Sequence, residues 1–276
     1  MTDPLASGTP LVIAAHGTRD EAGVAECRAL AERVARKLPG IPVELGFVEL
    51  AEPGIPEAVR AAVAQAPDNP EGADGDEEAA AVVVPLMFNT GGHVREDIPE
   101  AIDEGRGDAR VMYSAPLLPD VRMRKALNHR LTETLAAGEG REEWRPRDTS
   151  AVLVGRGALV PDANASHYTL TRMFWEENDL SRVEPAFIQV TRPSVPEALS
   201  ALAAQGADQI VVQGNFLFPG LLHVWMTEQV EAWQASHPGV EIRIPEREQW
   251  PHQCPRHAPR RRSYRTPTRR SGRRSC

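Results

Sequence analysis

Two histidines and a carboxylate in the first half of the chain, His16, Glu49 and His93, each stand at or just beyond the end of a short apolar run. Such runs, separated by helical patterns, are typical of buried parallel strands, whose carboxyl ends meet at one edge of a sheet. Two imidazoles and a carboxylate that converge there could hold a divalent first-row metal ion and accept protons near neutral pH. The structural alternative is that each histidine caps a helix or bonds a backbone carbonyl, and the residues alone leave both interpretations open.

The elements that would position these side chains follow from the alternation of apolar runs and amphipathic segments. In chain order the pattern predicts a strand at 11–15, a helix at 21–37, a strand at 43–50, a helix at 55–64, a strand at 81–88, a helix at 97–104 and a strand at 110–114. Alternation of strand and helix predicts a parallel sheet flanked by helices. The acidic segment at 67–78 is typical of a solvated loop.

An internal repeat indicates two related lobes. When segment 43–59 is shifted by 140 positions onto 183–199, 7 of 17 residues are identical, whereas unrelated segments share about one. The second-lobe counterparts of the three candidate site residues are then Arg156, Gln189 and His223. Because an arginine suits an anionic ligand but cannot act as a base or hold a cation, we expect the second lobe to lack the metal-handling set. A core histidine explains His223 as well as a functional one does.

The fold class expected is therefore α/β, with two tandem related lobes, each a parallel β-sheet flanked by helices, and a cleft between them. The predicted division is an N-terminal lobe with the candidate histidines at 1–137, an exposed linker at 138–150, a second lobe at 151–250 and a disordered Arg/Pro-rich tail at 251–276. Fused lobes can form the cleft internally, which favours a monomer. The tail does not continue the repeat, and the sequence leaves open whether it is native or a frameshifted or truncated end.

Glycines flank the candidate residues. Gly17, Gly91 and Gly92 lie beside the histidines, and Gly155 and Gly157 flank the arginine of the second lobe. Turns after strands explain them, and they would also let a bulky ligand approach the backbone. No glycine-rich nucleotide-binding motif is present. In the second lobe we expect Asp162 to be a helix N-cap.

Charge and cysteine content limit the function classes. Residues 255–276 hold nine arginines and no acid, whereas the rest of the chain holds 39 acids against 22 basic residues, a formal charge of −17. Nucleic-acid binding would therefore depend on the tail alone, whose His252, Cys254 and His257 match no metal-site template. Three cysteines without a C-x-x-C pair predict a reducing, cytoplasmic environment, with Cys27 buried on a helix. Neither a membrane span nor a signal peptide is expected.

The motifs around the candidate residues resemble those of the CbiX/SirB family of sirohydrochlorin chelatases. The matching stretches are His-Gly-Thr-Arg-Asp at 16–20, Phe-x-Glu-Leu-Ala-x-Pro at 47–53, and Pro-Leu-x-Phe-x-x-Gly-x-His-Val-x-x-Asp-Ile-Pro at 85–99. The second lobe is similar to the second half of the long, two-lobe members. The resemblance covers roughly residues 10–245 and stops at the tail.

The resemblance implies a lyase that inserts Co²⁺ or Fe²⁺ into sirohydrochlorin, an anionic tetrapyrrole, on the way to cobalamin or sirohaem and without ATP. It implies that His16 and His93 handle the metal and accept protons, that Glu49 assists, and that the metal is a substrate rather than a permanent cofactor. We further expect substrate contacts from the residues that charge and motif position single out, namely Arg19, Gly91, Gly92, Arg95, Arg156 and His223.

Two other functions are compatible with the residues. The same histidines would let a non-catalytic carrier hold a metal ion or tetrapyrrole tightly and at one equivalent. Association with nucleic acid through residues 251–276 would fall steeply with salt and vanish when the tail is deleted. Neither alternative involves a membrane.

Overall fold

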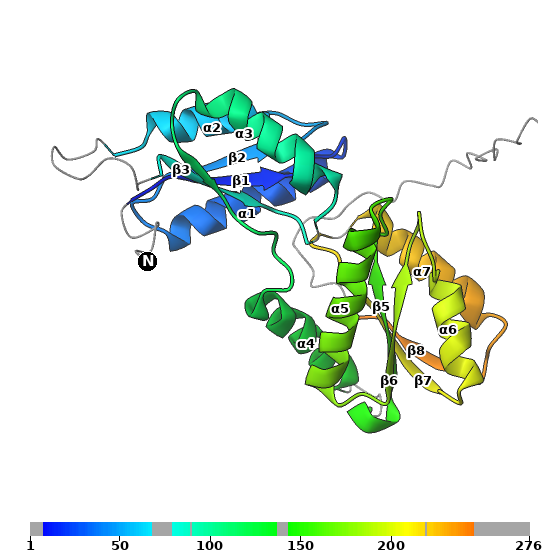
Figure 1. Ribbon diagram of the computed structural model, residues 1–276. Coiled ribbons are helices and arrows are strands. Elements are labelled where there is room, and N and C mark those ends of the chain that lie inside the picture. Colours follow the sequence, from blue (N-terminus) through cyan, green and yellow to red (C-terminus); the bar gives the residue numbers. More distant parts are fainter. Residues whose placement is uncertain (1–7, 68–78, 89, 137–142, 219, 246–276) are drawn as a thin grey trace, which may run out of the picture.

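The described residues form two lobes, each built on a four-stranded parallel sheet (Figure 1). The computed structural model describes residues 8–67, 79–88, 90–136, 143–218 and 220–245. The predicted α/β fold with two related lobes is confirmed. The acidic segment 68–78 and the tail lie outside the described residues.

The first lobe has the strand order β2-β1-β3-β4. Its elements are β1 (Leu11–Ala15), α1 (Glu21–Lys37), β2 (Val43–Phe47), α2 (Ile55–Ala64), β3 (Ala81–Pro85), a π-helical turn η2 (His93–Asp97), α3 (Ile98–Arg106) and β4 (Val111–Tyr113). The central strand β1 is buried along its whole length, because α1 covers one face of the sheet and α2 and α3 cover the other. This explains why its sequence is continuously apolar.

The second lobe repeats this topology with the order β6-β5-β7-β8. Its elements are β5 (Ser150–Gly155), α5 (Pro161–Asn178), β6 (Arg182–Phe187), α6 (Val195–Ala204), β7 (Gln209–Gly214), α7 (Leu221–Gln234) and β8 (Glu241–Arg243). The similarity extends to individual backbone hydrogen bonds. The N–H of Phe47 donates to the Pro53 carbonyl at 2.9 Å, and the N–H of Phe187 donates to the Pro193 carbonyl at 2.8 Å. The final strand β8 pairs with β7.

Two strands are shorter than predicted. β2 ends at Phe47 and β3 at Pro85, although the apolar runs continue to Leu50 and Phe88. The chain turns at both places, and the apolar side chains beyond the strand ends pack as loop residues, Val48 on the first core and Phe88 on the second. Glu49 therefore lies in a loop rather than in a strand.

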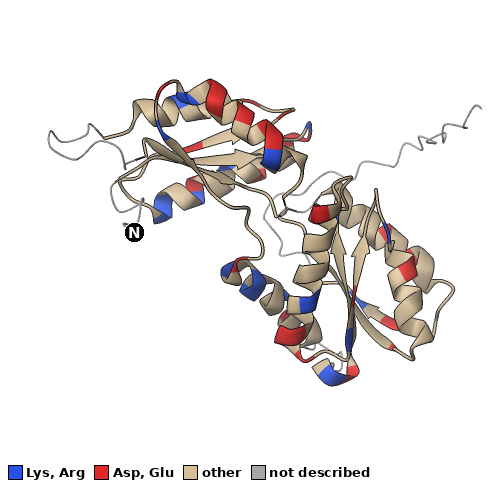
Figure 2. Cartoon of the chain, viewed as in Figure 1, with Lys and Arg blue, Asp and Glu red and all other residues tan. Residues whose placement is uncertain are grey.

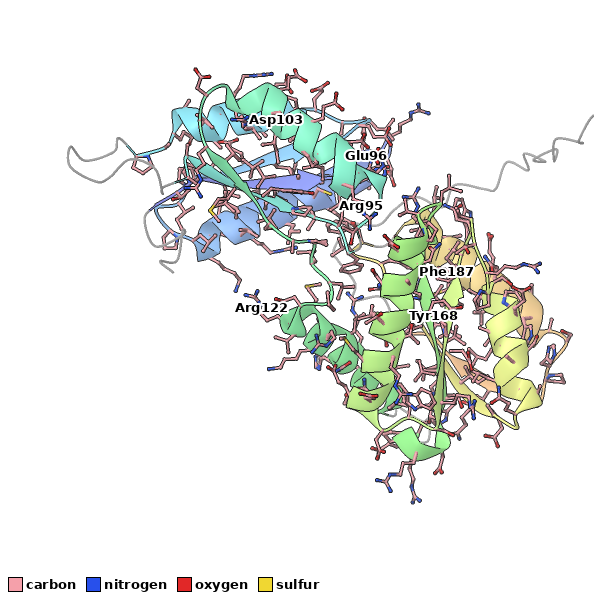
Figure 3. The ribbon with its side chains drawn as sticks, viewed as in Figure 1. Arg95, Glu96, Asp103, Arg122, Tyr168 and Phe187 are labelled. Atoms are coloured by element: carbon pink, nitrogen blue, oxygen red, sulfur yellow. The ribbon has the colours of Figure 1, made fainter. Side chains whose placement is uncertain are left out.

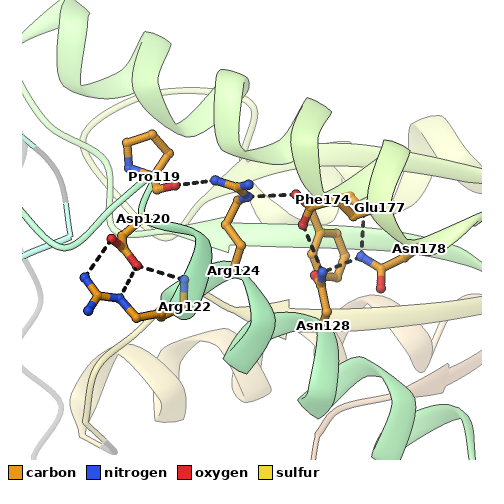
Figure 4. A network of polar contacts seen from close by, with 8 residues as sticks. All are labelled: Pro119, Asp120, Arg122, Arg124, Asn128, Phe174, Glu177 and Asn178. Carbon is orange, nitrogen blue, oxygen red and sulfur yellow. Dashed lines mark hydrogen bonds and ion pairs between the residues drawn. The ribbon is translucent and has the colours of Figure 1, made fainter.

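Helix α4 (Val121–Leu135) follows the first sheet along the chain but packs on the second. Leu127 and Leu131 join the core around β5 and α5, and the Gln213 side chain of β7 donates to the Leu127 carbonyl at 2.9 Å. At the surface, Arg124 and Asn128 donate to the two oxygens of Glu177 on α5 at 2.8 and 2.9 Å (Figure 4). Figure 2 shows basic residues near the start of α4 and acidic residues near the end of α5. The predicted first lobe, 1–137, thus includes a helix that completes the second sheet.

The segment between the lobes contains a buried anchor. Trp144 is 2% exposed in the second core, and the guanidinium of Arg243 on β8 lies 3.9 Å from its ring centroid. Thr149 and Ser150 are also buried. The expectation of an exposed linker at 138–150 is therefore wrong for these residues, because the short 3₁₀ helix at Pro146–Asp148 leads directly into the central strand.

The lobes exchange aromatic side chains at equivalent positions of the repeat. Phe88, after β3, packs against the second-lobe cluster that includes α4, and Phe218, after β7, packs against Ala15, Cys27 and Phe47 of the first lobe. A small apolar pocket of about 60 Å³ lies at this junction. Since tetrapyrrole-sized ligands need pockets of several hundred Å³, it is not the predicted substrate cleft.

Cys27 is buried as predicted. Burial raises the pKa of its thiol to about 11, so it remains protonated and behaves as a small apolar residue. None of the helices in the described ranges is long and apolar enough to cross a membrane.

His167 on α5 supplies a pH test of the fold. It is 1% exposed, it donates from Nε2 to the Leu153 carbonyl at 3.1 Å, and burial lowers its pKa to about 4. Because the unfolded chain binds the proton more readily, His167 should make the unfolding free energy fall as the pH drops from about 6.5 to 4, by up to about 1.4 kcal/mol per pH unit. We expect His167→Gln to lose this slope in urea denaturation across that pH range.

His129 of α4 provides the control for this measurement. Its side chain is 72% exposed, so His129→Gln should keep the wild-type slope. An unchanged slope in His167→Gln would contradict the account of a neutral, buried imidazole.

Candidate metal and proton-transfer site

His16 stands at the carboxyl end of the central strand, where the loop after β2 lies directly against it. The N–H of Glu49 donates to the His16 carbonyl at 3.1 Å, so the loop continues the ladder beyond the strand. Gly17, at φ 91°, permits this approach, because a Cβ there would lie 1.8 Å from the Glu49 carbonyl oxygen. The glycine of the His-Gly motif is thus required by close backbone packing.

Glu49 is followed by a residue in the left-handed region, Leu50 at φ 66°. Val190 has the same conformation, φ 73°, after Gln189 in the second lobe. Non-glycine residues seldom adopt it, and it stores strain. Because the second lobe keeps this conformation where the candidate site residues are replaced, it belongs to the repeated backbone framework rather than to metal chemistry.

His93 lies on the π-helical turn that precedes α3. Two buried residues anchor this turn, Val94 (4% exposed) and Ile98 (0%), and the hydroxyl of Tyr113 on β4 donates to the Val94 carbonyl at 2.9 Å. π-Helical turns are rare and occur often at functional sites. The sequence predicted a helix only from residue 97 onward, and it indicated neither this turn nor the role of Tyr113.

The three side chains converge as predicted. The rings of His16 and His93 meet edge to face with centroids 4.7 Å apart, and His16 Nε2 lies 3.9 Å from a carboxylate oxygen of Glu49. One potential ligand atom from each residue lies within 4.8 Å of the others. The side chains are 35%, 34% and 49% exposed for His16, His93 and Glu49, so the cluster is open to a ligand.

Local hydrogen bonds fix which ring nitrogens are free. His16 Nδ1 lies 3.0 Å from the carbonyl oxygen of Gly17, and His93 Nδ1 lies 2.5 Å from Oδ2 of Asp97. Since a carbonyl and a carboxylate accept hydrogen bonds, each Nδ1 carries the hydrogen and each Nε2 keeps its lone pair. Two such nitrogens and a carboxylate oxygen suit a divalent first-row metal ion, and three protein ligands leave coordination positions open for a second ligand.

The residues predicted to contact substrate differ in their exposure. Arg19 and Arg156 are exposed after β1 and β5, and an added Cβ at Gly91 or Gly92 would meet nothing within 4 Å. His223 is half-buried in the first turn of α7 and does not belong to the cluster of potential metal ligands found in the described residues.

Arg95 connects the lobes. It extends from η2 toward the start of α5 (Figure 3), and its guanidinium pairs with Asp162 at 3.0 Å. The prediction that Asp162 caps the helix is wrong, since Val160 is the N-cap and no side chain caps it. Asp162 lies in the first turn instead, where its negative charge interacts favourably with the helix dipole.

The fold is therefore that of a two-lobe α/β protein. A candidate metal site, made of two histidines and a carboxylate, lies at the carboxyl edge of the first sheet. The model of the CbiX family matches residues 10–134 and 150–246. The chain belongs to the CbiX family.

Relatives of the chain carry chelatase names. It is 30% identical over 207 residues to a sirohydrochlorin cobaltochelatase of Priestia megaterium, a match that covers 74% of this chain but only 63% of that relative. It is 26% identical over 231 residues to a sirohydrochlorin ferrochelatase of Bacillus subtilis, covering 82% and 81% of the two chains.

Solved structures share the fold. Bacillus subtilis SirB with Fe³⁺ superposes with a TM-score of 0.70 at 25% identity, covering 87% of this chain and 90% of that one. The cobalt complex of the sirohydrochlorin chelatase SirB from Bacillus subtilis subspecies spizizenii gives a TM-score of 0.64 at 23% identity, with 86% of both chains covered, and supports the fold.

The hydrogen bond from Tyr113 should stabilise the turn that carries His93. Tyr113→Phe should lower the unfolding free energy by about 1 kcal/mol near neutral pH, since it leaves the Val94 carbonyl without its donor. Burial raises the pKa of Tyr113 to about 12, so the wild-type advantage should be complete below pH 10 and disappear as the pH rises through 12. Urea denaturation at pH 8 and pH 11.5 measures this, with Tyr168→Phe, whose ring is 47% exposed, as the matched control. Equal stability of Tyr113→Phe and wild type at pH 8 would contradict it.

Proposed function

We propose that this chain is a sirohydrochlorin chelatase that inserts Co²⁺ or Fe²⁺ into the macrocycle without ATP, through His16, Glu49 and His93. The observation that supports this most strongly is the convergence of one ligand atom from each of two imidazoles and a carboxylate, within 4.8 Å of one another, on an open edge of the first sheet. The family and the names of its relatives supply the substrate.

Metal insertion requires a base and a metal-delivering ligand on the same face of the ring. The macrocycle loses two pyrrole N–H protons while the nitrogen electron pairs bind the incoming ion, so the reaction releases two protons for each metal ion. A neutral imidazole at Nε2 can accept such a proton, and a second one beside it can hold the ion. The rings of His16 and His93, which meet edge to face with centroids 4.7 Å apart, supply the base and the metal ligand side by side.

Glu49 assists through its charge. Its carboxylate, 3.9 Å from His16 Nε2, attracts the divalent ion and stabilises the imidazolium that forms when His16 accepts a proton. A proton-accepting pair and a ligand set with open positions favour transfer of the ion over its storage.

The carboxylates of the macrocycle require cationic partners. Arg19 and Arg156 are exposed and available at the strand ends of the two lobes, whereas Arg95 is already paired with Asp162, so a substrate carboxylate at Arg95 would have to displace Asp162. We place the macrocycle in a cleft between the lobes, with Gly91 and Gly92 allowing its close approach and His223 on the opposite side.

The choice of metal follows supply rather than ligand type. Imidazole and carboxylate ligands accept Co²⁺ and Fe²⁺ alike, so the product belongs to cobalamin or sirohaem formation according to the ion delivered. A cytoplasmic monomer remains part of this proposal.

Replacement of single histidines tests the assignment. His93→Ala should reduce the initial rate of metal insertion, followed by the visible spectrum of sirohydrochlorin under anaerobic conditions, by about 100-fold or more, because it removes a base and a ligand together. His223→Ala is the matched control at the equivalent position of the second lobe and should change the rate by less than about tenfold.

Both variants must first be shown to be folded by circular dichroism and thermal unfolding. Near-normal insertion by folded His93→Ala would refute the role of His93. Equal losses in both variants would show that the second lobe shares the chemistry.

A further inference from the structure

We propose that Asp97 is a positioning residue that holds the His93 ring in the Nδ1–H tautomer, so that Nε2 carries the free lone pair of the ring that lies beside His16 and Glu49. The tautomer and ring orientation stand on geometry alone, whereas the consequence for chelation rests on the proposed function. Neither the sequence motifs nor the comparisons assign Asp97 a role.

The contact itself is short and direct. Oδ2 of Asp97 lies 2.5 Å from Nδ1 of His93, and the two side chains are 50% and 34% exposed. An ionised carboxylate can only accept a hydrogen bond, so the ring must donate from Nδ1. Carboxylate–histidine pairs of this kind orient the imidazole of metal ligands and raise its basicity.

The backbone places the two residues for this contact. They open and close one π-helical turn, in which the N–H of Ile98 donates to the His93 carbonyl. Val94 and Ile98 are buried, and Tyr113 holds the turn from β4. With the backbone fixed at both ends, the side-chain torsions of His93 remain to be set, and Asp97 sets them.

A simpler structural role for Asp97 does not account for the contact. Asp97 occupies the N-cap position of α3, where an aspartate usually bonds the free backbone N–H groups of the helix start. Here its side chain makes no such capping bond, and its backbone is already helical. The carboxylate is directed at the imidazole instead.

The second lobe offers an internal comparison. His223 corresponds to His93, and the residue four positions further on is Thr227, whose hydroxyl donates to the His223 carbonyl at 3.0 Å. The lobe that has Arg156 and Gln189 in place of the histidine and glutamate also has no carboxylate at this position. The carboxylate thus accompanies the complete metal-handling set.

The same tautomer is selected in a different way at His16. Its Nδ1 donates to the backbone carbonyl of Gly17, which is fixed by the fold. Asp97 performs for His93, on a turn without such a carbonyl contact, what the main chain performs for His16.

NMR of the metal-free protein tests the tautomer without reference to activity. In protein with ¹⁵N-labelled histidine at pH 8, long-range ¹H–¹⁵N spectra distinguish protonated from unprotonated ring nitrogens, and His93→Gln identifies the His93 signals. We expect an unprotonated Nε2 in wild type and a shift toward the Nε2–H form in Asp97→Ala. Asp97→Leu, which is similar in size and has no hydrogen-bond acceptor in its side chain, serves as the second variant if Asp97→Ala does not fold.

Glu96→Ala is the matched control. Glu96 lies on the same turn (Figure 3) and its replacement removes the same charge, so it should leave the His93 tautomer unchanged. A protonated Nε2 in wild type, or a spectrum of Asp97→Ala or Asp97→Leu that matches wild type at His93, would overturn the proposal.

Steady-state chelation tests the functional consequence. Asp97→Ala should lower kcat by about 10- to 100-fold with little change in the KM for sirohydrochlorin, and Asp97→Glu should recover part of the loss. A tautomer change with normal kcat would overturn the role in chelation. If the wild-type protein has no chelatase activity but Asp97→Ala still changes the His93 tautomer, the positioning role of Asp97 is supported and the proposed function is refuted.

Discussion

The site depends on one backbone approach, in which the loop that carries Glu49 lies against the end of the strand that carries His16. Parallel strands deliver their following loops to one edge, and Gly17 removes the Cβ that would otherwise clash with the Glu49 carbonyl. The turn after β3 adds His93 to the same edge. Any larger residue at Gly17 would push two of the three groups apart, so the geometry of the cluster is a property of this contact.

The duplicated lobes show how side chains can change on a constant backbone. Gly157 approaches the Gln189 carbonyl as Gly17 approaches that of Glu49, and the left-handed residue follows in both loops. The second lobe has therefore kept the framework of the site while carrying an arginine and an amide there. Phe88 of the first lobe packs on the second lobe, and Phe218 of the second lobe packs on the first. Together with the packing of α4 on the second sheet, these contacts hold the two lobes together.

Patterns local in the sequence predicted much of the fold and of the site. The apolar runs located β1 and α1, and the repeat revealed the second lobe, because burial on a sheet or helix face leaves a periodic signal. Contacts between distant residues left none: the burial of Trp144 and the pairing of Arg95 with Asp162 depend on how the lobes meet. The contact between Asp97 and His93 is different, because the two residues are four positions apart. Side chains at this spacing lie next to each other on a helix, so the sequence could have predicted this contact.

We propose that the histidine cluster transfers metal repeatedly rather than retaining it. The most direct test follows the anaerobic visible spectrum of excess sirohydrochlorin with a small amount of the protein and either Co²⁺ or Fe²⁺, against a reaction without protein. We expect many equivalents of metallated product for each protein molecule, at a rate well above that of the reaction without protein. A spectral change that stops at one equivalent would show a carrier and contradict it.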